Sequence, residues 1–299
     1  MARARKKVLV LSRITTLERL SGQDGRPRIG SLASRQSAWF ARIEEAHGDH
    51  QDMLSTIRSA LSRLGCASRV VQSMEGLDPN RYDLVLTAGG DGTVLYASHH
   101  VETTPILGVR SSRHSAGYLT GAARRDVEKK LSAFTRGRLE STLLQRMSVL
   151  VGDRLMHDKI LNEALFSHPN PAVTTRYVLI VDGRSEEQMS SGLWVGPAAG
   201  STAAIRSAGG RILSATSRNI QFVVREPITR PGMRVGLTRG LIPAGRELIV
   251  ANKWQPARLY LDGPHLVIPV RPGQEVKMRL SDRPLTLLGW SKRTSRRSP

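Results

Sequence analysis

The segment with the clearest chemical potential is Gly89-Gly90-Asp91-Gly92-Thr93. It follows the apolar run Tyr82–Thr87 and precedes Val94–Ser98, which has the composition of a helix start. Glycines let the backbone turn sharply and approach a ligand closely, and backbone N–H groups at a helix N-terminus attract anions. A glycine-rich turn between a buried strand and a helix therefore predicts a phosphate-binding loop.

Asp91 is unexpected in a loop that only binds phosphate, because like charges repel. The carboxylate therefore suggests one of two chemical roles: it binds Mg²⁺, or it accepts the proton of a hydroxyl group. A purely structural interpretation stays open, in which the glycines form a tight turn and Asp91 caps the helix that follows.

Two further segments have the residue types to hold a ligand. Gly196–Ala204 consists mostly of small residues, which leave room for a flat ligand against the backbone. Its Ser201 and Thr202 hydroxyls can contact that ligand or cap a helix, and a plain strand-to-helix turn is the alternative. Asn162-Glu163 places an amide beside a carboxylate, a pair that can grip a ribose or an adenine edge but is usually a surface feature.

The composition is that of a globular protein with a strong positive charge. The chain has 299 residues, 39% of them hydrophobic, and its 45 Lys and Arg against 25 Asp and Glu give a net charge of +20. Such a field attracts phosphates, although solvated arginine-rich faces explain it more simply. With only 4 Phe, 5 Tyr and 4 Trp, no aromatic–basic interleaving is available to stack bases, so we expect no specific nucleic-acid partner.

Membrane, metal and redox signals are weak. No apolar run approaches the roughly 18 residues of a membrane span, so we expect no membrane insertion. The basic stretch Met1–Lys7 runs directly into Val8–Leu11, and we interpret it as the solvated start of a strand rather than a targeting segment. The histidines show no metal-binding spacing. Cys66 is the only cysteine, which excludes an intrachain disulfide and suits a cytoplasmic location.

The N-terminal part of the chain has the pattern of a parallel α/β sheet. Apolar residues recur at helical spacing over Asp52–Leu64, before Gly65, a typical helix stop. Ser21–Ser34 is rich in Gly, Ser, Arg and Pro and predicts a mobile loop. Four apolar runs predict strands: Val8–Ser12, Ala67–Val71, Tyr82–Thr87 and Pro105–Val109.

From about Arg138 onward the pattern changes to short apolar runs separated by turns such as Asp182-Gly183 and Asp262-Gly263. This predicts a mostly antiparallel β domain, with the boundary near residue 137. The runs that predict its strands are Met147–Val151, Tyr177–Val181, Leu193–Val195, Phe222–Val224, Leu248–Ala251, Leu259–Leu261 and Leu266–Val270.

Taken in this order, the motifs resemble the NAD kinase family, from Lys7 to about Leu288. The GGDGT sequence is shared with diacylglycerol, sphingosine and phosphofructokinase-type enzymes. The Asn-Glu pair and the Gly-Ser-Thr-Ala segment, closed by Ser207–Gly210, are more particular to NAD kinases. The segments that resemble the mitochondrial-type branch are Thr15–Glu18, Gly108–Leu119 and Ser190–Leu193.

The resemblance implies an NAD kinase-like two-domain fold, with an α/β N-terminal domain and a β-rich C-terminal domain. Residues 1–137 would form the α/β phosphate-binding domain that carries the GGDGT loop, and residues 280–290 would return to it. Residues 138–279 would form the β-rich dinucleotide-binding domain. Family members are usually homo-oligomers, so the resemblance implies an oligomer here.

The resemblance also implies a reaction with NAD and ATP as substrates and Mg²⁺ as cofactor. The 2′-hydroxyl of the adenosine ribose of NAD attacks the terminal phosphoryl group of ATP, the phosphate donor, to give NADP. Asp91 matches the aspartate whose proposed role is to take or orient the hydroxyl proton. The other matching residues, which cradle phosphates, hold the dinucleotide or line its adenine side, are Gly89, Gly90, Gly92, Thr93, Asn162, Glu163, Ser201, Thr202 and Ala203.

The sequence departs from the common family pattern at several positions. Ala204 replaces an aromatic residue that would stack, Arg110 replaces an asparagine, and Ser191 replaces an aspartate, as in the mitochondrial-type branch. Arg211 and Ala199 are further departures. NADH as acceptor and polyphosphate as donor therefore stay open. Two alternative functions also stay open: a lipid kinase of the GGDGT superfamily, and a nucleotide-binding descendant without catalysis.

Overall fold

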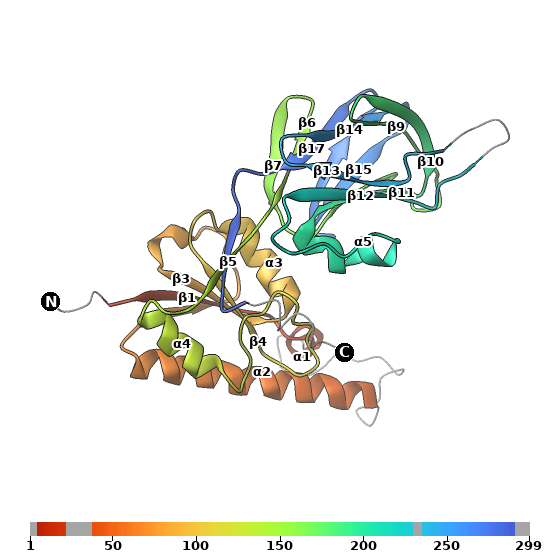
Figure 1. Cartoon of the computed structure of the whole chain (residues 1–299). Helices are drawn as coiled ribbons and strands as arrows, with labels where there is room; N and C mark the ends of the chain where they lie inside the picture. The colour runs from red at the N-terminus through yellow and green to blue at the C-terminus, as the bar shows by residue number, and fades with distance from the viewer. Residues whose placement is uncertain (1–4, 22–37, 230–234, 291–299) are drawn as a thin grey trace. The chain divides into compact units, whose positions relative to one another are not determined.

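The computed structural model describes residues 5–21, 38–229 and 235–290. The chain divides into two compact units (Figure 1). The first unit comprises Met1–Thr142 with Leu285–Pro299, and the second comprises Leu143–Pro284. The loop predicted at Ser21–Ser34 lies, apart from Ser21, outside the described residues.

The first unit is built on a six-stranded sheet in the order β2-β1-β3-β4-β18-β5. The pairs β1–β2, β1–β3, β3–β4 and β4–β18 are parallel, as the α/β pattern predicts. The last strand among the described residues, β18, thus lies beside β4. The strands are β1 (Lys7–Ser12), β2 (Ala67–Val71), β3 (Leu84–Gly89), β4 (Ile106–Arg110), β5 (Ser141–Leu144) and β18 (Leu285–Leu288).

Helices cover both faces of this sheet. Figure 1 shows α2 (Ala38–Arg63) and α4 (Val127–Thr135) on one face and α3 (Asp91–His100) on the other. Apolar residues of α2 and α4, such as Ile57 and Leu131, pack with strand residues such as Val10 in one core. α2 begins earlier than the predicted helix and ends before Gly65, whose φ of 68° is the left-handed conformation of a helix stop. The short helices are α1 (Thr16–Leu20) and the 3₁₀ turn η1 (Pro79–Arg81).

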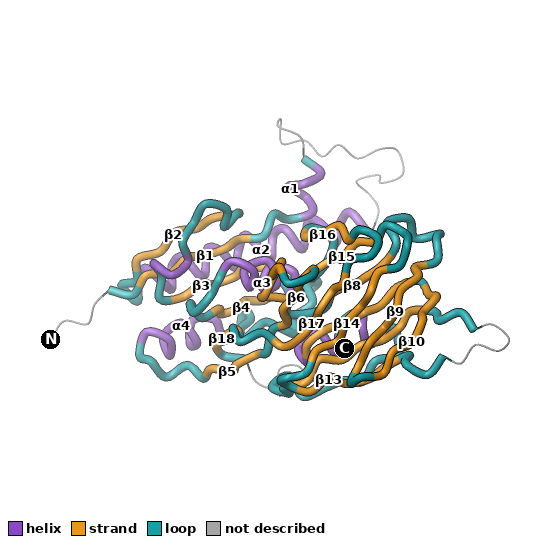
Figure 2. The backbone as a smooth tube through the Cα atoms, turned by 90° about the horizontal axis from the view of Figure 1, so that it is seen from above, coloured by secondary structure: helices purple, strands orange, loops and turns teal. Residues whose placement is uncertain are grey.

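The second unit consists of two six-stranded sheets, in the orders β10-β9-β14-β17-β6-β7 and β13-β12-β11-β8-β15-β16. Their strand pairs are antiparallel, and Figure 2 shows the strands lying side by side. Inward residues of both sheets, such as Tyr177 and Phe166, share one core. The strands are β6 (Met147–Val151), β7 (Arg154–Ile160), β8 (Ala164–Ser167), β9 (Thr175–Val181), β10 (Arg184–Ser190), β11 (Gly192–Pro197), β12 (Asn219–Arg225), β13 (Arg239–Pro243), β14 (Glu247–Asn252), β15 (Ala257–Leu261), β16 (Leu266–Val270) and β17 (Glu275–Leu280).

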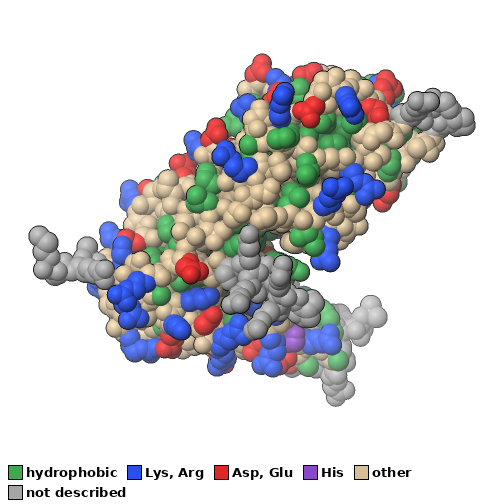
Figure 3. Space-filling model, viewed as in Figure 1, with side chains coloured by type: hydrophobic (Ala, Val, Ile, Leu, Met, Phe, Trp, Pro, Cys, Tyr) green, Lys and Arg blue, Asp and Glu red, His purple; other side chains and the backbone are tan. Residues whose placement is uncertain are grey.

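Two short helical segments follow β11 in the second unit: the 3₁₀ turn η2 (Ala198–Thr202) and α5 (Ala204–Ser207). On the face shown in Figure 3, Lys and Arg side chains are spread among Asp and Glu side chains rather than gathered in one patch. Among the described residues, no helix has the length and apolar character needed to cross a membrane.

Candidate functional site

The glycine-rich turn joins the buried strand β3 to helix α3. The carbonyl of Gly90, the N-cap of α3, accepts the backbone N–H of Thr93 at 3.0 Å. A Cβ on Gly89 would overlap the Thr93 side chain, and a Cβ on Gly90 would lie 2.9 Å from the carbonyl oxygen of Ala116. Both positions therefore require glycine, because neighbouring atoms already occupy the space of a side chain.

Asp91, the first residue of α3, does not cap its own helix. Its Oδ2 accepts the backbone N–H of Tyr118 at 3.0 Å, and its Oδ1 accepts the backbone N–H of Leu119 at 2.8 Å. Burial raises the pKa of Asp91, against the opposite effects of these two hydrogen bonds and of the positive charge of Arg110. The carboxylate is thus held in one orientation by a loop that lies 27 and 28 residues further along the chain.

The segment after β18 supports that loop. The indole Nε1 of Trp290 donates to the carbonyl oxygen of Tyr118 at 2.6 Å. The ammonium of Lys130 donates to the carbonyl oxygens of Gly121 and Gly289, and the distance to Gly289 is 3.1 Å. The loop that contains Tyr118 and Leu119, the two residues that position Asp91, is therefore tied to the last described residues of the chain.

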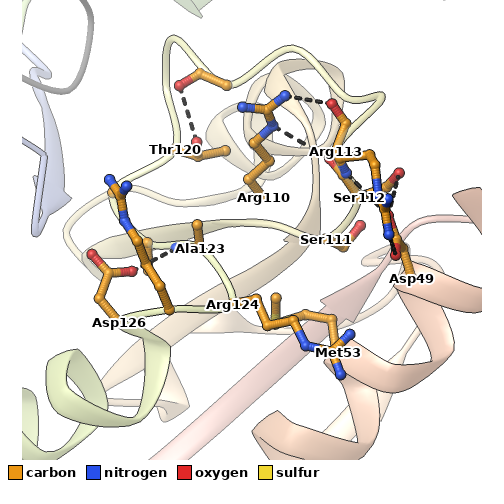
Figure 4. Close-up of a pocket in the computed structure, with 14 residues that line it drawn as sticks. Asp49, Met53, Arg110, Ser111, Ser112, Arg113, Thr120, Ala123, Arg124 and Asp126 are labelled. Carbon is orange, nitrogen blue, oxygen red and sulfur yellow. Dashed lines mark hydrogen bonds and ion pairs between the residues drawn. The ribbon is translucent and has the colours of Figure 1, made fainter. Parts of the chain in front are cut away.

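A cavity of about 630 Å³ lies beside the same loop, within the first unit (Figure 4). The guanidinium of Arg110 lines this cavity and donates to the carbonyl oxygens of Ser112, at 3.3 Å, and Arg113, at 2.5 Å. Arg113 in turn pairs with Asp49 at 3.2 Å. Arg110 and Arg113 therefore brace the loop through internal contacts. The residues that line the cavity are Asp49, Met53, Arg110, Ser111, Ser112, Arg113, Gly117, Thr120, Gly121, Ala122, Ala123, Arg124, Arg125 and Asp126.

Asn162 and Glu163 lie in the short connection between β7 and β8 of the second unit. Asp262 holds this connection, because its carboxylate accepts the backbone N–H groups of Leu161 at 2.8 Å, Asn162 at 2.7 Å and Glu163 at 3.0 Å. The N–H of Asp262 donates in turn to the carbonyl of Glu163 at 2.9 Å. The Asn-Glu pair therefore has a defined backbone conformation, set by a residue about 100 positions further along the chain.

Glu163 is a buried acid whose Oε2 has no hydrogen-bond partner among the described residues. Burial raises its pKa to about 7, the negative charge of Asp262 acts in the same direction, and a backbone hydrogen bond from Ala204 opposes both. A buried carboxylate oxygen without a partner is costly in a folded protein. Glu163 therefore has a carboxylate oxygen whose hydrogen-bonding capacity is unused among the described residues.

The small-residue segment packs directly on this pair. A Cβ on Gly200 would overlap the backbone of Asn162, and a Cβ on Gly196 would overlap its carbonyl oxygen. Ser201 is fully buried, and its Oγ accepts the N–H of Leu213 at 3.0 Å, so this hydroxyl anchors the following loop. Thr202 and Ala203 are partly exposed beside it.

The structure brings the predicted residues together within each unit. Gly89, Gly90, Gly92 and Thr93 surround Asp91 in the first unit, and the Asn-Glu pair contacts residues 200–204 in the second. Sequence reasoning missed three residues that support them: Asp262, Trp290 and Lys130. The sequence predicts a turn at Asp262-Gly263, and the φ of 49° at Asp262 agrees with a turn. Nothing in the sequence indicates that the Asp262 side chain contacts residues 161–163.

Residues 33–139 match the family model of the ATP-NAD kinase N-terminal domain. The chain is 31% identical to a probable NADH kinase of Oryza sativa subsp. japonica over 260 residues, which cover 79% of this chain and 80% of the relative. It is 30% identical to an NAD kinase of Methanoregula boonei, over 72% of this chain and 81% of that protein. The chain belongs to the NAD kinase family.

Solved structures agree with this family in fold. An NAD kinase from Archaeoglobus fulgidus in complex with ATP superposes with a TM-score of 0.68 at 21% identity, over 97% of this chain and 96% of that one. Yeast NADH kinase complexed with NADH gives a TM-score of 0.70 at 16% identity, over 97% and 85% of the two chains. The family, the two-part fold and the assignment as a kinase, all predicted from the sequence, are confirmed.

Asp91 is the carboxylate of the glycine turn that could contact a metal ion carried in by a substrate. No cluster of three or more His, Cys, Asp and Glu side chains able to bind a metal occurs among the described residues. Asp91 uses one acceptor position of each carboxylate oxygen for the backbone, and each oxygen keeps another. This set fits Mg²⁺, which is usually held by one or two carboxylates together with substrate phosphates and water.

Proposed function

We propose that this NAD kinase family member transfers the terminal phosphoryl group of ATP to the 2′-hydroxyl of the adenosine ribose of NAD or NADH, with Asp91 as the catalytic residue. The family assignment supports the reaction, and it removes the support for the lipid-kinase alternative. The observation that carries the residue assignment is the fixed Asp91 carboxylate at the glycine turn, held by Tyr118 and Leu119.

Asp91 suits the role of proton acceptor for the attacking hydroxyl. Its two backbone hydrogen bonds orient the carboxylate and leave acceptor capacity on each oxygen. That remaining capacity lets the carboxylate accept the proton of a hydroxyl group. In the transfer, the hydroxyl proton moves to Asp91, the ribose oxygen bonds to the γ-phosphorus, and the bond from that phosphorus to the β-phosphate oxygen breaks.

The remaining residues of the proposed site bind and position the substrates. Backbone N–H groups at the Gly89–Thr93 turn would hold donor phosphates, and Asp91 would be the protein ligand of Mg²⁺. Bound Mg²⁺ would neutralise charge that develops on the transferred phosphoryl group. Asn162 and Glu163 would hold the ribose or adenine of the dinucleotide, with Thr202 and Ala203 beside them and Ser201 supporting the loop. No covalent intermediate is required, because phosphoryl transfer depends mainly on positioning and charge neutralisation.

The choice between NAD and NADH is part of this proposal. The relatives include an Oryza protein named as a probable NADH kinase and a Methanoregula protein named as an NAD kinase. We propose that both dinucleotides are accepted, because the adenosine ribose that receives the phosphate is the same in both. A cytoplasmic location and assembly into homo-oligomers stay predictions.

The test is a coupled assay with ATP, Mg²⁺ and NAD or NADH, in which an NADP-specific dehydrogenase reports NADP and chromatography reports NADPH. Asp91→Asn is expected to reduce turnover by about 10²- to 10⁴-fold, the usual loss when a positioned general base is removed. Calorimetry should show that the variant still binds NAD. Wild-type protein that binds NAD and forms no NADP or NADPH would support the non-catalytic alternative, and unchanged turnover in Asp91→Asn would remove Asp91 from the chemistry.

A further inference from the structure

The first unit has a topological switch point between β1 and β3. The chain leaves β1 towards β2 on one side, and β3 then pairs with the other side of β1 and continues to β4. In open α/β sheets, ligands bind outside the carboxyl ends of the strands at such a point. The Gly89–Thr93 turn follows one of the two strands, and Arg13 directly follows the other.

Arg13 is fixed close to the glycine turn. Its backbone N–H donates to the carbonyl of Ala88, the residue before Gly89, at 3.0 Å. Its Nη1 donates to the Oγ of Ser115 at 3.1 Å. The Cβ of Ser115 lies 3.2 Å from the position that a Cβ on Gly90 would take. The side chain of Ser115 therefore contacts the Arg13 guanidinium and also lies next to Gly90 of the proposed phosphate-binding turn.

The charge of Arg13 is incompletely satisfied in the described part of the chain. Its Nε is buried and has no acceptor among the described residues. The nearby carboxylate is that of Glu18, which accepts the backbone N–H of Thr15 at 2.6 Å as part of a helix capping box. Burial lowers the pKa of Arg13, with Glu18 opposing this effect and Arg19 adding to it. No carboxylate of the described residues forms an ion pair with Arg13, and its one side-chain hydrogen bond goes to a neutral hydroxyl. A partly desolvated guanidinium without an acid partner is a strong binding group for an anion.

The neighbouring helix α2 does not supply that anion: its Glu45 and Asp49 pair with Arg113, and its two histidines carry no negative charge. The buried imidazole of His50 lies between the hydroxyls of Ser12, at 3.0 Å, and Ser111, at 2.9 Å. Burial, and then the charge of Arg13, lower the pKa of His50 to about 4, so His50 is neutral at physiological pH. His47 contacts Thr15 at 2.9 Å. Neither histidine neutralises Arg13.

We propose that Arg13 is a binding residue for the phosphate chain of the donor. This inference rests on the proposed function, and it adds a cation to a loop that otherwise offers backbone N–H groups and a carboxylate. Arg110 is the arginine whose charge acts on Asp91, but its Nε and one terminal nitrogen already donate to loop carbonyls. The residues proposed to hold the dinucleotide belong to the second unit, which leaves the phosphate-binding groups of the first unit for the donor.

The experiment compares Arg13→Met and Arg13→Lys with the wild type and with Arg63→Met. Arg63 is a matched control because it belongs to the same unit and forms a surface ion pair with Glu128, in which its side chain is 60% exposed. Calorimetry would measure tripolyphosphate and NAD binding, the coupled assay would give KM for ATP and for NAD, and thermal melting would report folding.

For Arg13→Met we expect tripolyphosphate affinity to fall, and KM for ATP to rise, by about tenfold or more, with KM for NAD changed less than twofold. Arg13→Lys should be intermediate, since lysine keeps the charge but loses the planar fork. Unchanged tripolyphosphate binding in Arg13→Met, or a rise in the KM for NAD without one for ATP, would overturn the assignment.

If the wild type forms neither NADP nor NADPH, the proposed function is wrong. The tripolyphosphate measurement still decides in that case whether Arg13 binds phosphate, because it does not depend on turnover. If Arg13→Met melts well below the wild type, the decision rests on Arg13→Lys. Weaker tripolyphosphate binding by a normally folded Arg13→Lys supports the assignment, and unchanged binding contradicts it.

Discussion

The carboxylate of Asp262 accepts the backbone N–H of Asn162 at 2.7 Å, across about 100 residues of sequence. Two further N–H groups, of Leu161 and Glu163, donate to the same carboxylate. Three hydrogen bonds to one charged group fix the backbone of the short connection between β7 and β8. The position of the proposed dinucleotide-binding pair therefore depends on a side chain that need not touch the ligand.

Replacing Asp262 by Ala should raise the KM for NAD by about tenfold or more and leave the KM for ATP nearly unchanged, because the loop that carries Asn162 and Glu163 loses its acceptor. Asp262→Asn should be intermediate, since an amide oxygen still accepts and Asn tolerates the φ of 49°. The matched control is Asp182→Ala, because Asp182 has a φ of 48° in a similar Asp-Gly turn of the same unit. Equal kinetic effects of Asp262→Ala and Asp182→Ala would contradict the assigned role.

Glu163 should make stability depend on pH in a specific direction. Its folded-state pKa of about 7 lies above the usual 4.5, so the folded protein binds the proton more tightly than the unfolded chain. Its favourable contribution is complete below pH 4.5 and is lost as the pH rises to about 7. Relative to wild type, Glu163→Gln should therefore gain at most about 3 kcal/mol in unfolding free energy between pH 4 and pH 8.

Denaturant titrations of both proteins at a series of pH values would measure this difference. Glu44→Gln provides the control, because Glu44 is an exposed glutamate of α2. A Glu163→Gln curve parallel to the wild-type curve across this range would show that the Glu163 carboxyl is not destabilised by burial.

Gly200→Ala should disrupt the contact between η2 and the Asn-Glu pair, since the added Cβ would overlap the backbone of Asn162. Overpacking of this kind lowers the free energy of unfolding by about 1–3 kcal/mol. Gly48→Ala is the opposite case, because Gly48 is exposed within α2 with no atom within 4 Å of the added Cβ, and about 0.5–1 kcal/mol of stabilisation is expected. Chemical denaturation would measure both, and a neutral Gly200→Ala would mean that the two segments separate easily.

Trp290→Phe should lower kcat several-fold and leave the KM for NAD nearly unchanged. The substitution removes the 2.6 Å hydrogen bond to the Tyr118 carbonyl, and with it part of the support for the loop that orients Asp91. Trp254→Phe serves as the comparison, because Trp254 is 62% exposed. Steady-state kinetics would show the difference, and a kcat equal to the wild-type value would mean that Lys130 and the sheet hold the loop without Trp290.

The strands that the sequence pattern predicted are those with continuous apolar runs, such as β3 and β6. The strands it missed include β10 and β17. Charged residues alternate with buried ones in β17, because one side of the strand faces water, and the buried residues of β10 are the polar Gln188 and Ser190. The pattern also missed the first part of α2, where Ala38–Asp52 has only Phe40 and His50 as buried residues. Short, mixed segments carry too few apolar positions to show a period.

The glycine turn and the Asn-Glu pair could be predicted because local residue types reveal them. Their supports could not, because Asp91 and Tyr118 or Asp262 and Asn162 meet only after the chain has folded. Such contacts follow from tertiary packing, and no local pattern in a single sequence indicates which distant residues will meet. Arg13 belongs to this class, since its relation to Gly90 depends on the neighbouring position of β1 and β3 in the sheet.

Placing β18 beside β4 has a consequence for biosynthesis. A ribosome delivers the chain from its N-terminus, and domains that are continuous in sequence can fold as they emerge. The first unit lacks a strand until Leu285–Leu288 has been made, and the Trp290 contact to Tyr118 comes later still. The nascent polypeptide therefore has to be extended to residue 290 before the loop around Asp91 gains this support, so the enzyme matures only after the whole second unit has been made.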